Sequence, residues 1–127
     1  GRFTDVFELG LQNDNQAPFI NGVLHNPGAA ESSFVAGVKG LTVNRVHGHE
    51  PSIKLIKKKY PDAQVETMES AAFFYGCLSA GIPFIGLRSS SNHVEPRNRE
   101  SWKLDLAIEQ LNLVLIEMLE TLTTPAL

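Results

Sequence analysis

Two polar side chains stand where two expected strands end, and their types could do chemistry together. Met68 and Glu69 follow the short segment "AQVET", and Ser91 and Asn92 follow "IPFIGLRSS", which begins as an apolar run. A carboxylate accepts hydrogen bonds, whereas an amide both donates and accepts them. In parallel sheets, ligands bind beyond the carboxyl ends of the strands. We therefore expect Glu69 and Asn92 to converge on one crevice.

Each of these residues also has an ordinary structural interpretation. Glu69 falls in the first turn of an expected helix, where the helix dipole favours an anion by about 0.3–1 kcal/mol. Asn92 lies in "RSSSNHVEP", and an Asn that follows a strand is typically a turn residue. Local pattern alone leaves both alternatives open.

Two further groups of polar residues carry weaker signals. His47 and His49 are two positions apart, but no other Cys or His follows at a spacing typical of a metal site, so a loop is favoured. Ser89–Ser91 with His93 could supply a serine nucleophile, but the Gly-x-Ser-x-Gly pattern is missing. We expect neither a metal site nor serine chemistry here.

The elements that must position these residues alternate between strand and helix from about residue 40. We expect strands and helices in turn over residues 40–46, 50–60, 61–67, 68–81, 82–91 and 102–122. This alternation predicts an α/β fold with a parallel sheet. The helix at 68–81 and the apolar strand at 82–91 are both expected to be buried. Residues 10–32 predict a loop with at most one short strand.

Two of the expected helices show a clear apolar face. In the helix at 50–60, Ile53, Ile56 and Tyr60 lie on one side, and Pro51 suits the first turn. The last helix repeats apolar residues at alternating spacings of four and three: Leu104, Ile108, Leu111, Leu115, Met118 and Leu122. This spacing predicts a continuous face packed on the rest of the domain.

The composition indicates one soluble domain. The chain has 127 residues, of which 43% are hydrophobic and 20% charged, with a net charge of −3. The basic run Lys57–Lys59 is read as the solvated side of a helix, so we expect no nucleic acid partner. One cysteine, Cys77, is expected to be a buried thiol in a reducing cytoplasm. The sequence has no run of about 18 apolar residues, so we expect no membrane span.

The first forty residues do not read as a strand followed by a helix. A doubly wound α/β enzyme usually begins with such a unit, whose turn contributes to the ligand site. The chain also lacks an initiator Met. We therefore expect either an unusual small α/β domain or a larger one whose N-terminal half is absent.

The stretch 65–98, "VETMESAAFFYGCLSAGIPFIGLRSSSNHVEPRN", resembles the nucleoside phosphorylase and nucleosidase superfamily. It is closest to the branch of futalosine hydrolases and methylthioadenosine/S-adenosylhomocysteine nucleosidases. That branch has a Val-Glu-x-Glu ribose motif, and this chain has an additional-looking Glu66-Thr67 before Met68-Glu69. The residues that match in order and spacing are Met68, Glu69, Pro83, Phe84, Arg88, Ser91 and Asn92. The resemblance extends over residues 36–122 and, more loosely, over residues 3–27.

The resemblance implies a fold and an extent. Residues 1–127 would form a single domain, the C-terminal portion of a three-layer α/β/α phosphorylase-type fold with a mixed, largely parallel central sheet. The N-terminal half of this nucleosidase domain would be absent. It would hold the acidic residue and loops that position the attacking water, so the 127-residue chain alone is expected to be inactive.

The resemblance also implies catalytic roles for two residues. Glu69 would bind the ribose hydroxyls, and Met68 would pack on the sugar. Asn92, next to Ser91, would contact N7 and the 6-substituent of a purine. The adenine-specific nucleosidases carry Asp at the position of Asn92. The amide suits a 6-oxopurine, since it can accept from N7–H and donate to O6.

Further contacts follow from the same resemblance. Val46 and His47 would lie where the chain passes the edge of the base. The substrate's 5′ group would meet a neighbouring subunit, so a homodimer or higher homo-oligomer is implied. Candidates for the contact with that group or subunit are Phe7, Phe19, His93 and Arg97. The partner would be a purine nucleoside, and no cofactor or metal is implied.

Several functions remain open at this point. Hydrolysis of futalosine, a step in a route to menaquinone, fits Asn92 best. A phosphate-dependent purine nucleoside phosphorylase and a methylthioadenosine/S-adenosylhomocysteine nucleosidase share the same motifs. A non-catalytic nucleoside-binding domain would also keep them, and a structural α/β domain would need none. Assays of the full-length protein with and without phosphate separate the hydrolase from the phosphorylase.

Overall fold

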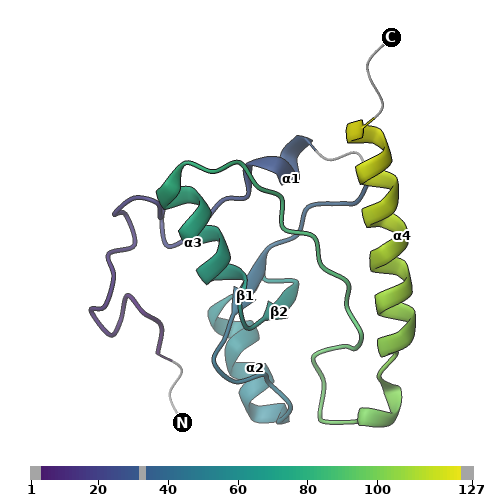
Figure 1. The fold of residues 1–127 in the computed structure, drawn as a ribbon. Coiled ribbons are helices and arrows are strands. Elements are labelled where there is room, and N and C mark those ends of the chain that lie inside the picture. Colours follow the sequence, from purple (N-terminus) through teal and green to yellow (C-terminus); the bar gives the residue numbers. More distant parts are fainter. Residues whose placement is uncertain (1–3, 32–33, 124–127) are drawn as a thin grey trace.

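The computed structural model describes residues 4–31 and 34–123 (Figure 1). The elements in chain order are α1 (Pro27–Glu31), β1 (Gly40–Thr42), α2 (Glu50–Lys59), β2 (Val65–Thr67), α3 (Ser70–Ala80), a 3₁₀ turn (Arg99–Ser101) and α4 (Leu104–Thr123). Helices and a small parallel sheet make this an α/β structure, as expected from the alternating pattern. Helix α1 and an isolated bridge between Ile20 and Val23 lie in the stretch expected to be mostly loop.

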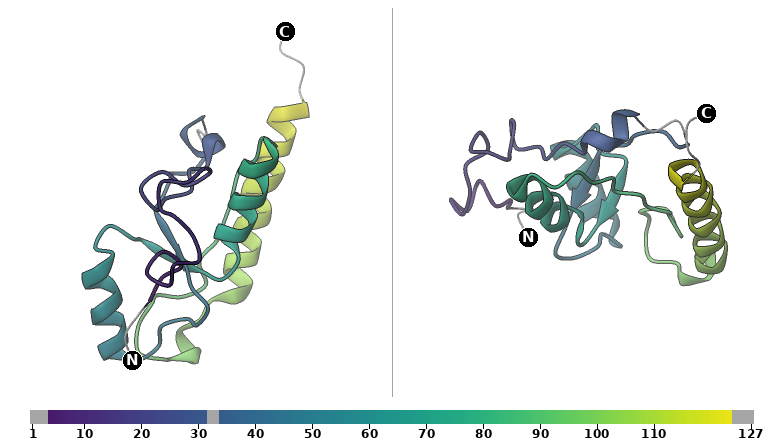
Figure 2. Two further views of the ribbon diagram at one scale, coloured as in Figure 1. Left: turned by 90° about the vertical axis from the view of Figure 1, so that its left-hand side faces the viewer. Right: turned by 45° about the horizontal axis from the view of Figure 1, so that its top comes forward.

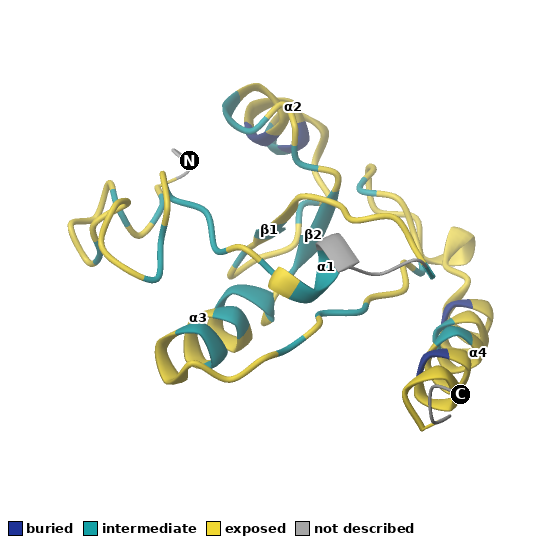
Figure 3. Cartoon of the chain, turned by 90° about the horizontal axis from the view of Figure 1, so that it is seen from above, coloured by how far each residue is buried: buried dark blue, intermediate teal, exposed yellow. Residues whose placement is uncertain are grey.

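The two strands pair in parallel, and α2 connects them. Gly40 lies opposite Val65 and Thr42 opposite Thr67, and the ladder continues with one bond from Val43 N–H to Thr67 O at 2.9 Å. Helix α2 lies on one side of the strands, and α3 and α4 lie on the other (Figures 2 and 3). The first strand is shorter than the predicted 40–46 because the chain turns away from its partner after Val43.

Helix α2 matches its prediction closely. Pro51 stands in the first turn, and Ile53 and Ile56 are buried on one face. The acidic Glu50 opens the helix and the basic run Lys57–Lys59 closes it, so both charges suit the helix dipole. Lys57 and Lys58 are exposed as expected, whereas Lys59 is half-buried.

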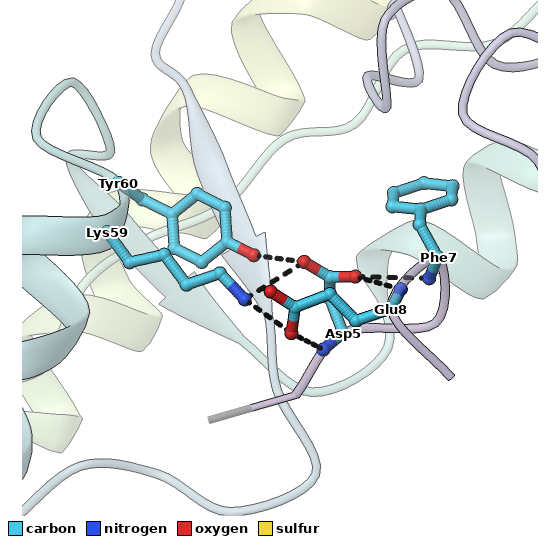
Figure 4. Close-up of polar contacts among 5 residues, drawn as sticks. All are labelled: Asp5, Phe7, Glu8, Lys59 and Tyr60. Carbon is cyan, nitrogen blue, oxygen red and sulfur yellow. Dashed lines mark hydrogen bonds and ion pairs between the residues drawn. The ribbon is translucent and has the colours of Figure 1, made fainter. Parts of the chain in front are cut away.

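Lys59 belongs to a polar cluster that ties the N-terminal loop to the end of α2 (Figure 4). Its ammonium lies 3.0 Å from Asp5 and 2.9 Å from Glu8. The Tyr60 hydroxyl donates to Asp5 at 2.8 Å, and Asp5 also accepts from the backbone N–H of Glu8 at 2.8 Å. The N–H of Glu8, with Tyr60 and Lys59, lowers the pKa of Asp5 to about 2, and burial raises the pKa of Tyr60.

Helix α3 begins and ends near the predicted residues but is not buried. Gly81 ends it in the left-handed conformation, with φ of 65°, which Gly adopts without steric penalty. No described residue of α3 is buried, and Phe73 is 43% exposed. The predictions of a buried helix and a buried thiol are therefore wrong. The described chain covers only part of this helix, and Cys77 is half-buried.

The apolar segment 82–91 is not a strand in the structure. Within the described ranges, residues 83–90 make no backbone-to-backbone hydrogen bond. Asn26 places its side-chain amide 3.2 Å from the carbonyl oxygen of Phe84 and 2.8 Å from the N–H of Gly86, an orientation that satisfies both. A strand needs a neighbouring strand with which to form a ladder of hydrogen bonds. The prediction was wrong because no described segment supplies one.

Helix α4 is as long as predicted, but its apolar stripe is mostly uncovered. Ala107 and Met118 are buried and Leu111 is half-buried, so they mark the covered side. The rest of the predicted stripe is exposed: Leu104, Ile108, Leu115 and Leu122. Figure 3 shows the outer side of α4 largely exposed. The spacing predicted the helix correctly, but nothing in the described chain packs on most of its apolar face.

No helix in residues 4–31 or 34–123 combines the length and the apolar character needed to cross a membrane.

Candidate functional site

The carboxyl ends of β1 and β2 fix the start of α3. The Thr42 hydroxyl accepts a hydrogen bond from the backbone N–H of Ala71 at 2.9 Å and lies 3.1 Å from the Thr67 hydroxyl. The first N–H groups of a helix lack partners within the helix, so a side-chain oxygen here stabilises its start. The two threonines therefore place Met68 and Glu69 at the edge where a parallel sheet binds ligands.

Glu69 and Met68 are both open to solvent at this edge. Glu69 is the residue just before α3 rather than part of its first turn, so the predicted position is off by one. Its side chain makes no capping hydrogen bond to the helix. Met68 is 49% exposed. The carboxylate is therefore available to accept from hydroxyl groups, with an apolar side chain beside it.

The Asn92 side chain is held by its own loop. Its amide oxygen accepts from the Ser91 hydroxyl at 2.8 Å, and its NH₂ group donates to the His93 carbonyl at 2.9 Å. The amide oxygen can accept two bonds and the NH₂ group can donate two. One acceptor and one donor on Asn92 therefore remain for a ligand, while the two loop bonds fix the amide plane.

The side chains of His47, in the loop after β1, and Glu66, in β2, form a buried pair. Their side chains are only 5% and 8% exposed. The carboxylate accepts from the backbone N–H of His47 at 3.0 Å and also bonds with its ring nitrogen Nδ1. Val46 beside it is 55% exposed. The loop after β1 is thus anchored to the strand that leads to Met68 and Glu69.

The same loop also contacts the segment that carries Asn92. The backbone N–H of Arg97 donates to the carbonyl of Gly48 at 3.1 Å. A Cβ atom on Gly48 would lie 3.5 Å from the Cβ of Arg97, so the two backbones run close together. Ser91 is held from the other side, because its carbonyl accepts from Lys103 N–H at 2.8 Å.

Phe7 and Phe19 pack within the chain. Their rings meet edge to face with centroids 5.1 Å apart, and Phe19 lies 5.8 Å from the ring of Tyr75 in α3. Both rings are half-buried. A role in a subunit contact or a 5′ pocket stays a prediction for these rings, as it does for the exposed His93 and Arg97.

The predicted residues are thus joined in part. The loop at 46–49 is hydrogen-bonded to β2 and to the loop at 88–98. In the part of the chain that the structure describes, no hydrogen bond or ion pair joins Glu69 to Asn92, so their predicted convergence stays a prediction. The sequence reasoning missed Thr42 and treated Glu66 as part of an added pair. Strand alternation was the available signal for Glu66, because it places this side chain on the face opposite Val65 and Thr67.

A separate apolar groove lies between α3, the extended segment and α4. It has a volume of about 370 Å³, and its lining residues are Phe73, Ile85, Leu87, Arg88, Leu111 and Leu115. None of the predicted site residues lines it. Among the described residues, no group of three or more His, Cys, Asp or Glu side chains is placed to hold a metal ion.

Comparison with known proteins places these residues in a context. The chain is 27% identical over 112 residues to a futalosine hydrolase of Streptomyces coelicolor, covering 86% of this chain and 45% of that protein. It is 34% identical over 92 residues to a futalosine hydrolase of Acidothermus cellulolyticus, covering 72% and 36%. The chain therefore spans less than half the length of either relative.

Both relatives are named futalosine hydrolase. The likeness supports a relationship to nucleoside phosphorylase and nucleosidase-like proteins. No protein-family model matches the chain, and no solved structure matches it.

Proposed function

We propose that the protein hydrolyses the N-glycosidic bond of a 6-oxopurine nucleoside, with futalosine as the substrate. The observation that carries this proposal is the Asn92 amide, which its loop holds in place with one acceptor and one donor left over. The likeness to two futalosine hydrolases supports it independently.

At the base, the Asn92 amide would read hypoxanthine. Its oxygen would accept from N7–H as negative charge builds on the leaving base, and its NH₂ group would donate to O6. An adenine base offers a donor where O6 would be, so the NH₂ group would be left unpaired. Such a mismatch costs about 1–3 kcal/mol for each buried unmatched group.

At the sugar, Glu69 would accept from the ribose hydroxyls with Met68 against the ring. The bond between the anomeric carbon and the base nitrogen breaks, and the ribose gains oxocarbenium character. A carboxylate fixed at the hydroxyls stabilises that positive charge, which is the usual route to large rate effects. Water adds its hydroxyl oxygen to the anomeric carbon, and the one proton that it releases accounts for the proton that the leaving base takes up at N7.

We also propose that these 127 residues are the C-terminal portion of a larger three-layer α/β/α domain. The exposed stripe of α4 and the extended segment without a ladder support this, since both expose apolar surface that a complete domain would cover. The relatives, more than twice as long as the aligned part, support it as well. The residues that position water would lie outside this chain, and a homodimer or higher oligomer would complete the 5′ pocket.

The base contact is tested by Asn92→Asp in the full-length protein. The Asp side chain can accept from a 6-amino group and, when it is protonated, give its proton to N7. We therefore expect the ratio of kcat/KM for hypoxanthine over adenine nucleosides to fall about tenfold or more. Release of free base is the readout. Asn112→Asp makes the same chemical change on the exposed side of α4 and should leave the ratio unchanged. An unchanged ratio in Asn92→Asp would refute the base contact.

The nucleophile is tested by assaying the full-length protein with and without phosphate. We expect free ribosyl product and equal rates in both conditions. Strict dependence on phosphate, with a ribose 1-phosphate product, would identify a phosphorylase instead. No turnover and no change in stability with any nucleoside would reject both.

A further inference from the structure

Glu66 is a carboxylate placed where carboxylates are seldom found. It stands at the middle of β2, and only 8% of its side chain is exposed. Acidic side chains are rarely so buried unless they are paired. Both of its oxygens are directed at one residue, His47.

The two bonds fix different parts of His47. The bond from the backbone N–H at 3.0 Å holds the loop after β1 against β2. The bond at Nδ1 holds the ring, and a carboxylate acceptor there favours the tautomer with its proton on Nδ1. One side chain of β2 therefore sets both the path of the loop and the state of the imidazole.

The next hydrogen bond carries this constraint onward. Gly48 follows His47 directly, and its carbonyl accepts from Arg97 N–H at 3.1 Å. Arg97 lies in the same loop as Asn92. The path from β2 to that loop thus consists of two hydrogen-bonded contacts, Glu66 with His47 and Gly48 with Arg97, joined by the peptide bond between His47 and Gly48.

We propose that Glu66 is a positioning residue for the base-reading loop. It holds His47 in the tautomer with a proton on Nδ1, and through Gly48 and Arg97 it keeps the Asn92 amide at the angle that the base requires. The consequence for catalysis rests on the proposed nucleosidase function, whereas the coupling between the two loops does not. Misplacing a site residue by about 1 Å reduces rates by about a hundredfold.

A purely structural role for the pair makes different predictions. Replacing a buried ionic pair often changes stability without changing how distant groups are oriented. A structural role therefore predicts a lower melting temperature with unchanged base preference. A positioning role predicts altered base preference and altered signals in the Asn92 loop.

The decisive variant is Glu66→Gln in the full-length protein. The Gln carbonyl can still accept from the backbone N–H of His47, but its NH₂ group can only donate. Nδ1 must then act as an acceptor, so the proton moves to Nε2. We expect ¹⁵N spectra of the imidazole to show this inverted tautomer, and the amide signals of Arg97 and Asn92 to shift.

In kinetics, we expect Glu66→Gln to lower kcat/KM for the hypoxanthine nucleoside about 10- to 100-fold, with weaker discrimination against adenine. Glu50→Gln removes the same charge from an exposed site at the start of α2 and should change neither the spectra of the loop nor the kinetics. Glu66→Asp keeps the carboxylate, so it should retain the Nδ1 proton and recover part of the discrimination. It serves as the test if the Gln variant does not fold.

The outcomes separate this inference from the proposed function. An inverted tautomer with shifted Arg97 and Asn92 signals, in a protein that cleaves no nucleoside, supports the positioning role and rejects the nucleosidase. An active protein whose Glu66→Gln variant keeps its base preference and its Asn92 and Arg97 signals overturns the positioning role.

Discussion

Helices α2 and α4 both have an apolar face, but α4 leaves most of its face uncovered by the described chain. α2 has ten residues, buries Ile53 and Ile56, and is tied to the N-terminal loop by Lys59. α4 has twenty residues, of which only Ala107 and Met118 are buried. The longer helix is the less covered one.

The difference teaches that periodicity reports which face a helix would bury, while the rest of the fold decides whether it does. The described chain covers Ile53 and Ile56, and the N-terminal loop contacts the end of α2 through Lys59. In the described chain, nothing packs on the exposed part of the α4 stripe. The same contrast holds for β2, which has a ladder, and for the segment 83–90, which has none.

The largest expected effect comes from comparing a substitution on the covered face of α2 with one on the uncovered face of α4. Ile56→Ala should lower the free energy of unfolding by about 2–4 kcal/mol, because it removes a buried side chain and leaves a cavity. Leu119→Ala, at a position that is 51% exposed, should change it by less than about 0.5 kcal/mol. Urea unfolding of the 127-residue chain measures both.

The same pair sharpens the proposal of a larger domain. In the full-length protein, Leu119→Ala should become as destabilising as a core substitution if additional chain covers α4. A loss that stays below about 0.5 kcal/mol in the full-length protein would show that this face remains open.

The next effect concerns the extended segment where it crosses α3. A Cβ atom on Gly86 would lie 2.7 Å from the Phe74 ring, so Gly86→Val should destabilise the chain by about 1–3 kcal/mol through overpacking. Gly76 in α3 has nothing within 4 Å of such an atom. Gly76→Ala should therefore stabilise the helix by about 0.5–1 kcal/mol. Equal destabilisation by both would mean that the segment does not pack on α3.

The smallest effect concerns the polar cluster at the end of α2. The pKa of Asp5 is lowered in the folded chain, from 3.8 to about 2. The contribution of Asp5 to the free energy of unfolding is therefore complete above about pH 4, and it is lost as the pH falls toward 2. We expect this contribution to be less than about 1 kcal/mol, because the cluster is partly solvated.

Melting temperatures from pH 6 to pH 2 measure this contribution. Asp5→Asn should flatten the acid limb of the curve. Asp14→Asn should not, because among the described residues the Asp14 carboxylate bonds only with the adjacent Asn15. Identical acid limbs in all three proteins would show that the cluster does not form.

The sequence predicted elements better than their surroundings. The Pro51 start, the Gly81 stop and the α4 spacing are local signals, so α2, α3 and α4 were placed within a few residues. Burial of α3 and the strand at 82–91 depend on neighbours far along the chain, and both predictions were wrong. A run of apolar residues indicates that a segment can be a central strand, but the ladder requires a partner.

The candidate site shows the same division. Glu69 and Asn92 were found from residue type, position and resemblance, and their roles stay predictions. Glu66 and Thr42 were not singled out, because their roles arise from contacts across 19 and 29 positions of sequence. Such contacts become visible only when β1 and β2 lie side by side.

The bond from Ala71 to the Thr42 hydroxyl has a practical consequence for protein engineering. The start of α3 is completed by an atom from another strand, so residues 65–81 are not a self-contained cassette. A graft of this segment into a foreign sheet should keep the geometry of Met68 and Glu69 only if the neighbouring strand offers a hydroxyl at the matching register. Ser would serve there as well as Thr, whereas Val, which has the same shape, would not.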